Sequence, residues 1–182
     1  MLRKVIAVAS VVLLMPLIAE AGSSWKKGKK RGNSELRQCL KTDPVHFNGT
    51  IVDAAVATPD FSTLVTAVTA AGLVDALSQP GNLTVFAPTN DAFANIPPAV
   101  LHAILADQSL LTSVLTYHVV AGSVHPRIAV VPREVDTLQG QGVFLSLDRD
   151  GPRVNQSNIA CQAVQTSNGT IWIIDSVLLP QF

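Results

Sequence analysis

Residues 84–93 read Thr-Val-Phe-Ala-Pro-Thr-Asn-Asp-Ala-Phe, and this stretch predicts a corner between a strand and a helix. The β-rich run at its start has to stop at Pro88, because proline has no N–H group to donate to a neighbouring strand. Thr89 or Asn90 can then accept a hydrogen bond from the free N–H groups of a following helical turn, and Asp91 suits the positive end of that helix. Taken alone, the stretch indicates a local corner and no particular fold.

The hydrophobic period changes along the chain, and this change predicts the fold class. Before residue 117 apolar residues recur at helical spacing, as in the stripe Phe61, Leu64, Val65 and Val68. The expected helices are Ile51–Ala57 capped by Thr50, a second one capped by Asp60, Leu73–Leu77, one that starts at Pro97-Pro98 with Val100, Leu101, Ile104 and Leu105 facing inward, and one capped by Asp107. The expected strands are Tyr117–Val120, Glu134–Leu138, Val143–Leu147, Arg153–Asn155, Ile159–Gln165 and Thr170–Val177. Helices first and strands later predict an α+β domain rather than repeated βαβ units.

Two further segments make the corner specific. They are Tyr117–Val120, which reads Tyr-His-Val-Val, and Gly169–Pro180, which reads GTIWIIDSVLLP. Together with residues 84–93 they resemble the fasciclin domain, a secreted adhesion and scaffold module, over about Asn48 to Pro180. The resemblance implies a compact wedge of two small sheets, flanked by short helices that come mainly from the N-terminal half.

The first residues of the chain have the pattern of a secretory signal peptide. Arg3 and Lys4 precede the apolar stretch 5–19, and Ala19-Glu20-Ala21 offers an Ala-x-Ala cleavage site with the cut after Ala21. An uncleaved membrane anchor is the alternative, although the stretch is short for a spanning helix. The expected division is a signal peptide at 1–21, a basic and largely disordered arm at 22–47, and a fasciclin domain at 48–182. We therefore expect a secreted or extracellular protein, or a periplasmic one if the source is Gram-negative.

A formal net charge of zero hides two opposite parts of the chain. Between Gly22 and Lys41 seven cations face one carboxylate, which gives +6, whereas from Thr42 onward four arginines face eleven carboxylates, which gives −7. The basic arm is a solvated tail, an arm that lies on its own acidic domain, or a binding segment for an anionic surface such as lipid headgroups, acidic polysaccharide or acidic protein. Its cations are Lys26, Lys27, Lys29, Lys30 and Arg31. Nucleic acid is not expected as a partner, because the folded part is acidic.

Cys39 and Cys161 are the only two cysteines. An exported chain meets oxidising conditions, so we expect one disulfide between them. Some secreted bacterial members of the fasciclin family carry a similar pairing. The two positions lack the spacing of metal ligands, and no metal or cofactor is expected.

Four asparagines stand in glycosylation patterns, namely Asn48, Asn82, Asn155 and Asn168. Each pattern has a second interpretation as turn chemistry, because asparagine tolerates tight turns. The sequence leaves both interpretations open.

The fasciclin resemblance places candidate interaction residues in its motifs. In some animal relatives the neighbourhood of Tyr117-His118 is associated with integrin binding. The alternative is structural: Tyr117 packs at the end of a helix and His118 hydrogen-bonds a neighbouring loop. The motif residues Thr89, Asn90 and Asp91 are likewise either helix caps or a contact surface. Asp175 interrupts an apolar run, so we expect it at a bend or bonded to backbone N–H groups.

The leading functional interpretation is a non-enzymatic adhesion module that binds protein or polysaccharide at the cell surface or in the matrix. Catalysis is not expected, because the sequence lacks Gly-x-Ser-x-Gly, His-Glu-x-x-His and a phosphate-cradling glycine loop. The alternative is an extracellular carrier of a small apolar ligand, a lipid or carotenoid, held in a groove between the helices of 61–77 and 97–116.

Overall fold

The computed structural model describes residues 31–129 and 131–181, so the predicted signal peptide and residues 22–30 of the arm lie outside it. The helices are α1 (Arg31–Leu40), α2 (Ile51–Ala57), η1 (Pro59–Phe61), α3 (Ser62–Ala70), α4 (Val74–Ser78), α5 (Asn90–Ala94), α6 (Pro98–Ala106), α7 (Gln108–Tyr117) and η2 (Pro126–Ile128). The strands are β1 (Val45–His46), β2 (Leu83–Pro88), β3 (Val119–Ala121), β4 (Arg133–Asp136), β5 (Gly142–Leu147), β6 (Pro152–Val154), β7 (Ser157–Gln165) and β8 (Gly169–Ile174). The predicted α+β class is confirmed.

The strands form one hydrogen-bonded path in the order β3-β2-β8-β7-β6-β5-β4, with β1 added to β7. β2 pairs with β8 in parallel, as β1 does with β7, and the other pairs are antiparallel. The two ends of the path meet, because the Leu138 N–H donates to the Val119 carbonyl oxygen at 2.7 Å. β7 pairs with β8 of one small sheet and with β6 of the other. The two small sheets that the resemblance implied are therefore continuous through β7.

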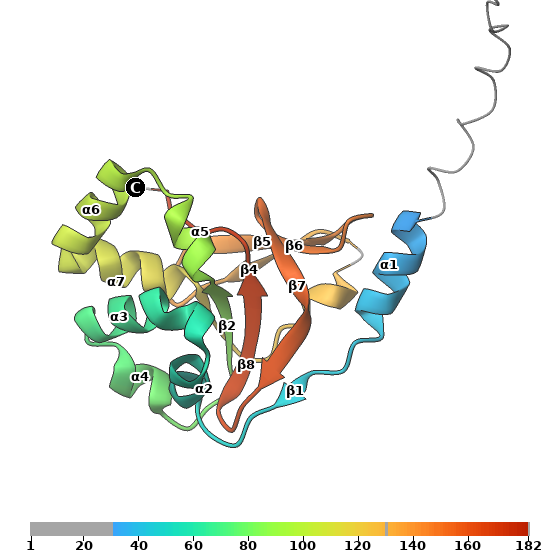
Figure 1. Ribbon diagram of the computed structural model, residues 1–182, viewed down its shortest axis with the longest axis horizontal. Coiled ribbons are helices and arrows are strands. Elements are labelled where there is room, and N and C mark those ends of the chain that lie inside the picture. Colours follow the sequence, from blue (N-terminus) through green and yellow to red (C-terminus); the bar gives the residue numbers. More distant parts are fainter. Residues whose placement is uncertain (1–30, 130, 182) are drawn as a thin grey trace, which may run out of the picture. The chain divides into compact units, whose positions relative to one another are not determined.

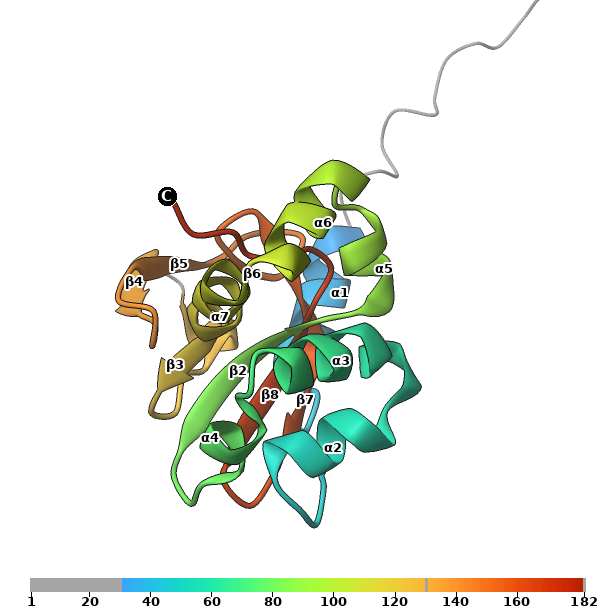
Figure 2. The ribbon, with the colours of Figure 1, turned by 90° about the vertical axis from the view of Figure 1, so that its left-hand side faces the viewer.

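Alternate residues of the central strands pack into two separate hydrophobic cores. In β2 the side chain of Val85 joins a cluster with the helices α2, α3 and α7, whereas that of Phe86 joins a cluster enclosed by strands. In β8 Ile171 and Trp172 divide in the same way. This division follows from the two-residue period of a strand, whose successive side chains point to opposite faces. Figures 1 and 2 show α2, α3 and α4 covering one side of β2 and β8.

Several helix starts follow the local signals in the sequence. The Thr50 hydroxyl accepts from the Asp53 N–H at 3.2 Å, while the Asp53 carboxylate accepts from the Thr50 N–H at 2.8 Å, so the two residues form a reciprocal cap on α2. Asp107 accepts from the N–H groups of Ser109 and Leu110 and caps α7 as predicted. The Asp148–Gly151 turn joins β5 to β6, as its sequence indicates.

Three of the predicted elements need correction. Asp60 does not cap a helix; it lies inside η1, and α3 begins after Phe61 without a side-chain cap of its own. Tyr117 is the last residue of α7 rather than the start of a strand. Along α6 only Ile104 is buried, whereas Val100 and Leu105 are exposed, because α6 packs chiefly against α7 with a narrow face.

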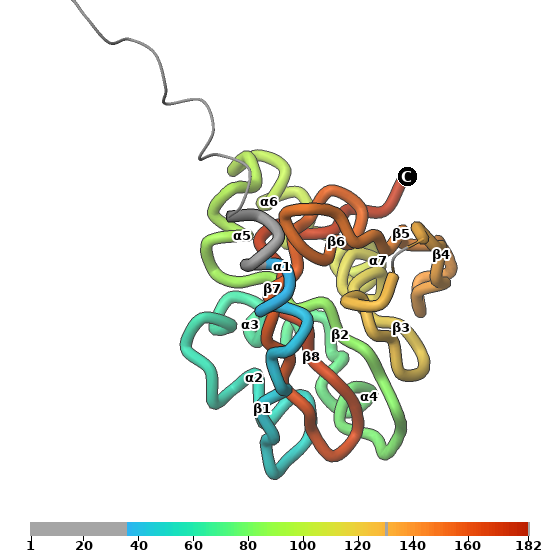
Figure 3. The backbone as a smooth tube through the Cα atoms, turned by 90° about the vertical axis from the view of Figure 1, so that its right-hand side faces the viewer, coloured from blue at the N-terminus to red at the C-terminus, as the bar shows by residue number. Residues whose placement is uncertain are grey.

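The expected disorder of 22–47 does not extend to its second half, where residues 31–40 form α1 and Val45–His46 form β1. A disulfide joins Cys39 to Cys161, with the two Cα atoms 4.8 Å apart. Arg127 donates to the carbonyl oxygens of Cys39 and Thr42, which ties the end of α1 to η2. Figure 3 shows α1 beside β7. The disulfide is the one expected from the two cysteines, whereas the Arg127 bonds connect residues far apart in the chain that no local sequence pattern could predict.

Candidate interaction site

The corner after β2 uses its polar residues for internal bonds. Thr89 accepts from the Ala92 N–H at 3.3 Å and caps α5. The Asn90 carboxamide accepts from the Thr63 N–H at 3.0 Å and donates to the Pro59 carbonyl oxygen at 3.0 Å. Asn90 therefore supplies the missing cap of α3 from elsewhere in the chain. Of the three motif residues, Asp91 alone is exposed.

His118 is a buried neutral histidine that fastens the C-terminal segment. Its Nδ1 lies 2.7 Å from the Val114 carbonyl oxygen, which can only accept, so Nδ1 carries the proton. Its Nε2 then accepts from the Leu178 N–H at 2.9 Å. Burial lowers the pKa of His118 from 6.5 to about 4, while the bond to Val114 opposes this shift. The structural alternative for His118 is thus the one observed.

Tyr117 lies next to His118 in sequence but serves a different part of the fold. Its buried ring joins the strand-enclosed core, and its hydroxyl donates to the Gly142 carbonyl oxygen at 3.1 Å. The same hydroxyl accepts from the Asn155 Nδ2 at 3.1 Å. These bonds connect the end of α7 to β5 and to the turn after β6.

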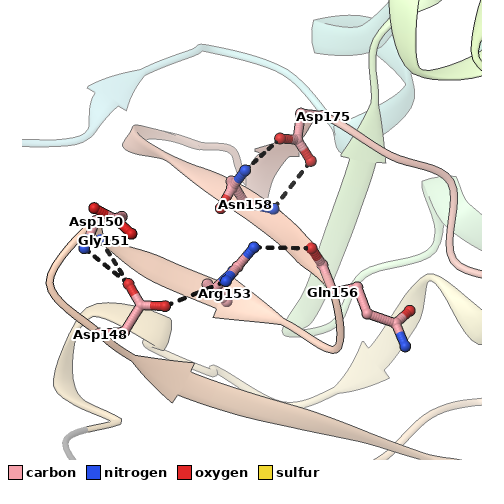
Figure 4. A network of polar contacts seen from close by, with 7 residues as sticks. All are labelled: Asp148, Asp150, Gly151, Arg153, Gln156, Asn158 and Asp175. Carbon is pink, nitrogen blue, oxygen red and sulfur yellow. Dashed lines mark hydrogen bonds and ion pairs between the residues drawn. The ribbon is translucent and has the colours of Figure 1, made fainter.

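Asp175 lies at the bend that follows β8, as expected. Its two carboxylate oxygens accept from the Asn158 backbone N–H at 3.0 Å and from the Asn158 side-chain amide at 2.6 Å. Figure 4 shows this pair beside the turn in which Asp148 accepts from the N–H groups of Asp150 and Gly151. Asp148 also forms a 3.3 Å ion pair with Arg153. These polar groups stabilise turns, and the predicted candidate residues do not converge on one site.

The asparagines of the four glycosylation patterns differ in exposure and in the hydrogen bonds of their side chains. Asn168 is only 3% exposed, and its amide donates to the carbonyl oxygens of Leu77 and Gln79 while its oxygen accepts from the Ile51 N–H. These bonds agree with the turn interpretation of Asn168, because a sugar on its amide nitrogen would disrupt the bonds to Leu77 and Gln79. Asn155 bonds both Tyr117 and Phe144 through its side chain. The remaining two, Asn48 and Asn82, are exposed.

A groove opens next to Tyr117, and the sequence analysis missed it. Its volume is about 850 Å³, within the range of ligand sites. It is lined by Tyr117, Glu134, Gln141, Gly142, Phe144, Asn155, Gln156, Leu179 and Gln181. Phe144 is 53% exposed, although it sits in β5 among buried neighbours, and Leu179 is also exposed. The alternation of β5 places Val143 and Leu145 in the core, so Phe144 has to face outward.

A second, smaller cavity of about 150 Å³ lies between the helices α2, α3 and α4 and the strand β2. Most of its lining is aliphatic, and the polar exceptions are Thr69 and His118. Val56 stands at its edge and is exposed. Six of its lining residues come from 61–77 and Leu115 comes from 97–116, while α2 and β2 supply further lining residues.

Within residues 31–129 and 131–181, no group of three or more histidine, cysteine or acidic side chains could hold a metal ion. In the same ranges no single helix is long and apolar enough to cross a membrane; two helix pairs, α2 with η1 and α3, and α6 with α7, reach the length and hydropathy together but bend by 108° and 107°.

Comparison with known proteins agrees with the sequence motifs. The profile described as the fasciclin domain matches residues 59–180. Protein sll1483 of Synechocystis sp. is 43% identical over 133 residues, which cover 72% of this chain and 73% of that protein. Immunogenic protein MPB70 of Mycobacterium bovis is 38% identical over 158 residues, or 82% and 80% of the two chains.

Two further similarities complete the comparison. Cell surface glycolipoprotein MPB83 of Mycobacterium bovis is 39% identical over 135 residues, which are 71% of this chain and 60% of that protein. A solved structure of a FAS1 domain pair from the insect cell adhesion molecule Fasciclin I is similar with a TM-score of 0.47 and 17% identity, and the match covers 65% of this chain and 45% of the pair. From the match to residues 59–180 and the 38–43% identity with relatives that are covered over 73–80% of their length, we conclude that this chain belongs to the fasciclin domain family.

Proposed function

We propose that this protein is an exported, non-enzymatic adhesion module that binds a protein or polysaccharide at the cell surface or in the matrix. Its membership of the fasciclin family supports this proposal, and one relative is named as a cell surface glycolipoprotein. The observation that carries it is the groove beside Tyr117, which combines an exposed ring with exposed polar side chains.

The chemistry of the groove suits a macromolecular partner. The exposed face of Phe144 offers apolar area to a sugar ring or an apolar side chain, and Leu179 extends it. The carboxylate of Glu134 accepts hydrogen bonds, and the amide of Gln156 both donates and accepts. Such a mixture of an apolar anchor and a polar rim is typical of protein interfaces. The floor is fixed, because the Tyr117 hydroxyl is bonded to Gly142 and Asn155.

Cell attachment to surfaces coated with the protein tests this proposal. The variants Phe144→Ala and Glu134→Gln should each reduce attachment, since they remove the apolar anchor and the anionic acceptor of the groove. Leu105→Ala is the matched control, because Leu105 is an exposed apolar residue on α6, outside the groove lining. Equal attachment by all variants would argue against the groove as the binding site.

The basic arm is a separate part of the proposed partner recognition. Lys26, Lys27, Lys29, Lys30 and Arg31 give the arm its positive charge. We expect it to favour anionic surfaces through long-range attraction. Replacing the four lysines with glutamine keeps the length of the arm and Cys39. If attachment is lost only in this variant and never in the groove variants, the folded domain is not the adhesive part.

The carrier alternative has its own supporting observation, the aliphatic cavity between α2, α3 and α4. A cavity of about 150 Å³ suits part of an acyl chain or another slender apolar molecule rather than a bulky one. Organic extraction and an absorbance spectrum of the purified protein test for a bound lipid or carotenoid. Val65→Trp would place an indole in the cavity lining and should lower the yield of any extracted ligand. A colourless protein with an empty extract would count against this alternative.

A further inference from the structure

The groove beside Tyr117 holds a carboxylate next to an aromatic ring. Glu134 of β4 and Phe144 of β5 stand directly opposite each other in an antiparallel pair, so their side chains share the outer face of the sheet. Gly142 lies on the same face, and a Cβ at this position would come within 2.7 Å of the Glu134 Cδ. The Glu134 side chain therefore lies over Gly142. Among the described residues it forms no salt bridge, so its carboxylate is free to accept hydrogen bonds from a ligand.

Carboxamides supply most of the other polar groups of the groove. Gln141 is occupied, because its side chain exchanges hydrogen bonds of 2.6 and 2.9 Å with the backbone of Gln181 and so holds the C-terminal segment as one wall. Gln181 itself is exposed. Gln156 accepts from Arg153 through its backbone carbonyl oxygen, and its side-chain amide points away from that bond (Figure 4). The amides of Gln156 and Gln181 are therefore available to a ligand.

These groups match the chemistry of an uncharged sugar. A carboxylate accepts from two neighbouring hydroxyl groups, and a carboxamide both donates and accepts. The ring of Phe144, which is 53% exposed, can pack against the C–H groups on the face of a sugar ring. The residues that line the groove include no lysine, arginine or histidine. An acidic polysaccharide would therefore meet the like charge of Glu134 without a cation in the lining to offset it.

We propose that the groove binds a neutral polysaccharide. Phe144 stacks on one sugar ring, and Glu134 and Gln156 bond its hydroxyl groups. The inference rests on the proposed adhesive function and names the class of partner. A protein also suits a surface with an apolar anchor and polar groups, but a stable protein interface takes about 20–30 residues a side. Nine residues line the groove, which suits a narrow chain of sugar rings better than a folded partner.

Cosedimentation with insoluble polysaccharides tests the proposal on the protein recovered after export. The neutral probes are cellulose, curdlan, mannan and starch, and calcium alginate is the anionic counterpart. The wild-type protein should bind at least one neutral probe and should not bind alginate. Binding should be equal at low salt and in about 0.5 M NaCl, because salt screens only ionic contacts. Binding to none of the neutral probes, or to alginate alone, overturns the proposal.

Substitutions in the groove separate stacking on a sugar from general apolar contact. Phe144→Leu keeps an apolar side chain but loses the flat ring, so it should weaken binding about tenfold, whereas Phe144→Trp should retain it. Glu134→Gln should weaken binding about threefold, because hydrogen bonds to a charged acceptor are stronger. Gly142→Ala should also weaken binding by displacing the Glu134 side chain. Gly81→Ala is its matched control, since a Cβ there would meet no atom within 4 Å. Equal binding by Phe144→Leu and the wild-type protein contradicts the proposal.

A gain of signal makes the test independent of disruptive substitutions. Compared with the wild-type protein, Phe144→Trp should change its emission when soluble oligosaccharides of the bound polymer are added, whereas Leu105→Trp should not. An unchanged emission of Phe144→Trp would count against contact between this ring and the sugar.

Treatment of the cells distinguishes this inference from the adhesion proposal. Periodate, which cleaves vicinal diols, should abolish attachment of cells to the coated protein, and protease treatment should not. Attachment that depends on Phe144 but survives periodate and is lost with protease would keep the adhesion proposal and overturn this inference. Polysaccharide binding in vitro, with attachment unaffected by Phe144→Ala, would support the inference and remove the groove from adhesion.

Discussion

The motif residues differ from the exposed aliphatic residues Ile128 and Val131 in what the fold does with their side chains. Thr89 caps α5, whereas Asn90 and His118 each make bonds that hold one element to another. Ile128 and Val131 are exposed instead. The difference teaches that the residues by which the family is recognised are occupied by folding, so recognition of a partner has to be sought where exposed side chains have no folding role. The following predictions test this contrast.

The Cys39–Cys161 disulfide should show the largest effect, because it is the covalent link between α1 and the sheet. It closes a loop across a separation of 122 residues. Its loss in Cys39→Ser/Cys161→Ser should lower the free energy of unfolding by about 4–5 kcal/mol on the chain-entropy account. Denaturant titration measures the loss, and hydrogen exchange at residues 36–42 should become faster. A change below about 1 kcal/mol would mean that Arg127 and β1 hold α1 without the disulfide.

Asn168 should come next, because one buried side chain serves three backbone groups. Asn168→Ala leaves the Ile51 N–H and the carbonyl oxygens of Leu77 and Gln79 without their partner. Each lost bond costs about 1 kcal/mol or more, so we expect a loss of about 3–4 kcal/mol in chemical denaturation. Asn82→Ala is the matched control, since Asn82 is an exposed member of the same sequence pattern and should change stability little. Similar losses in both variants would contradict the role assigned to Asn168.

His118 predicts a dependence of stability on pH. The folded state disfavours the second proton that makes the His118 ring a cation, so the ring has a pKa of about 4, whereas in the unfolded chain its pKa is near 6.5. Stability should therefore be full above about pH 6.5 and fall by about 3 kcal/mol as the pH drops to 4. His118→Gln should flatten this slope in urea titrations at several pH values.

The carboxylates of Asp53 and Asp107 affect the free energy of unfolding in a lower pH range than His118 does, so their contribution can be separated from that of His118. Hydrogen bonds from Thr50 lower the pKa of Asp53, and bonds from Ser109 and Leu110 lower that of Asp107. Their stabilisation is present above the ordinary value of 3.8 and is lost only as the pH falls below it. An unchanged slope between pH 6.5 and 4.5 in His118→Gln would show that another group is responsible.

Sequence reasoning predicted the parts of the fold that depend on neighbours in the chain. The caps Thr50, Thr89 and Asp107 need only a side-chain oxygen two or three residues before a free N–H group, and this spacing is visible in the sequence. Pro88 ends β2 for an equally local reason. The disulfide was predictable because two cysteines allow a single pairing.

Contacts over long distances in the chain were not predictable in this way. Asn90 looks like a cap of its own helix, but its amide bonds the start of α3, which lies 27 residues away. The polar sequence of α1 resembles a disordered arm. The helix is held in place by the disulfide to Cys161 and by the hydrogen bond from Arg127, and both partners are far away in the sequence. The groove likewise depends on β5 and the C-terminal segment coming together, where Gln141 and Gln181 exchange two hydrogen bonds.

Tyr117→Phe should have a moderate effect, because it keeps the buried ring and removes only the hydroxyl. The Gly142 carbonyl oxygen and the Asn155 amide each lose a bond, and both can reach water in the groove. We expect a loss of about 1 kcal/mol. The same variant should also loosen the groove floor, which a faster hydrogen exchange at Asn155 would report. A loss as large as that for Asn168→Ala would mean that the hydroxyl bonds are inaccessible to water.

The exposed pair Ile128 and Val131 should show the smallest effect on stability. Ile128→Asp/Val131→Asp removes side chains that are mostly in water already, so the free energy of unfolding should change by less than about 0.5 kcal/mol. Thermal and urea unfolding of this variant beside the wild-type protein measure the difference. A loss above about 2 kcal/mol would show that these aliphatics pack in the folded state. The contrast between motif residues occupied by folding and exposed residues without a folding role would then not hold.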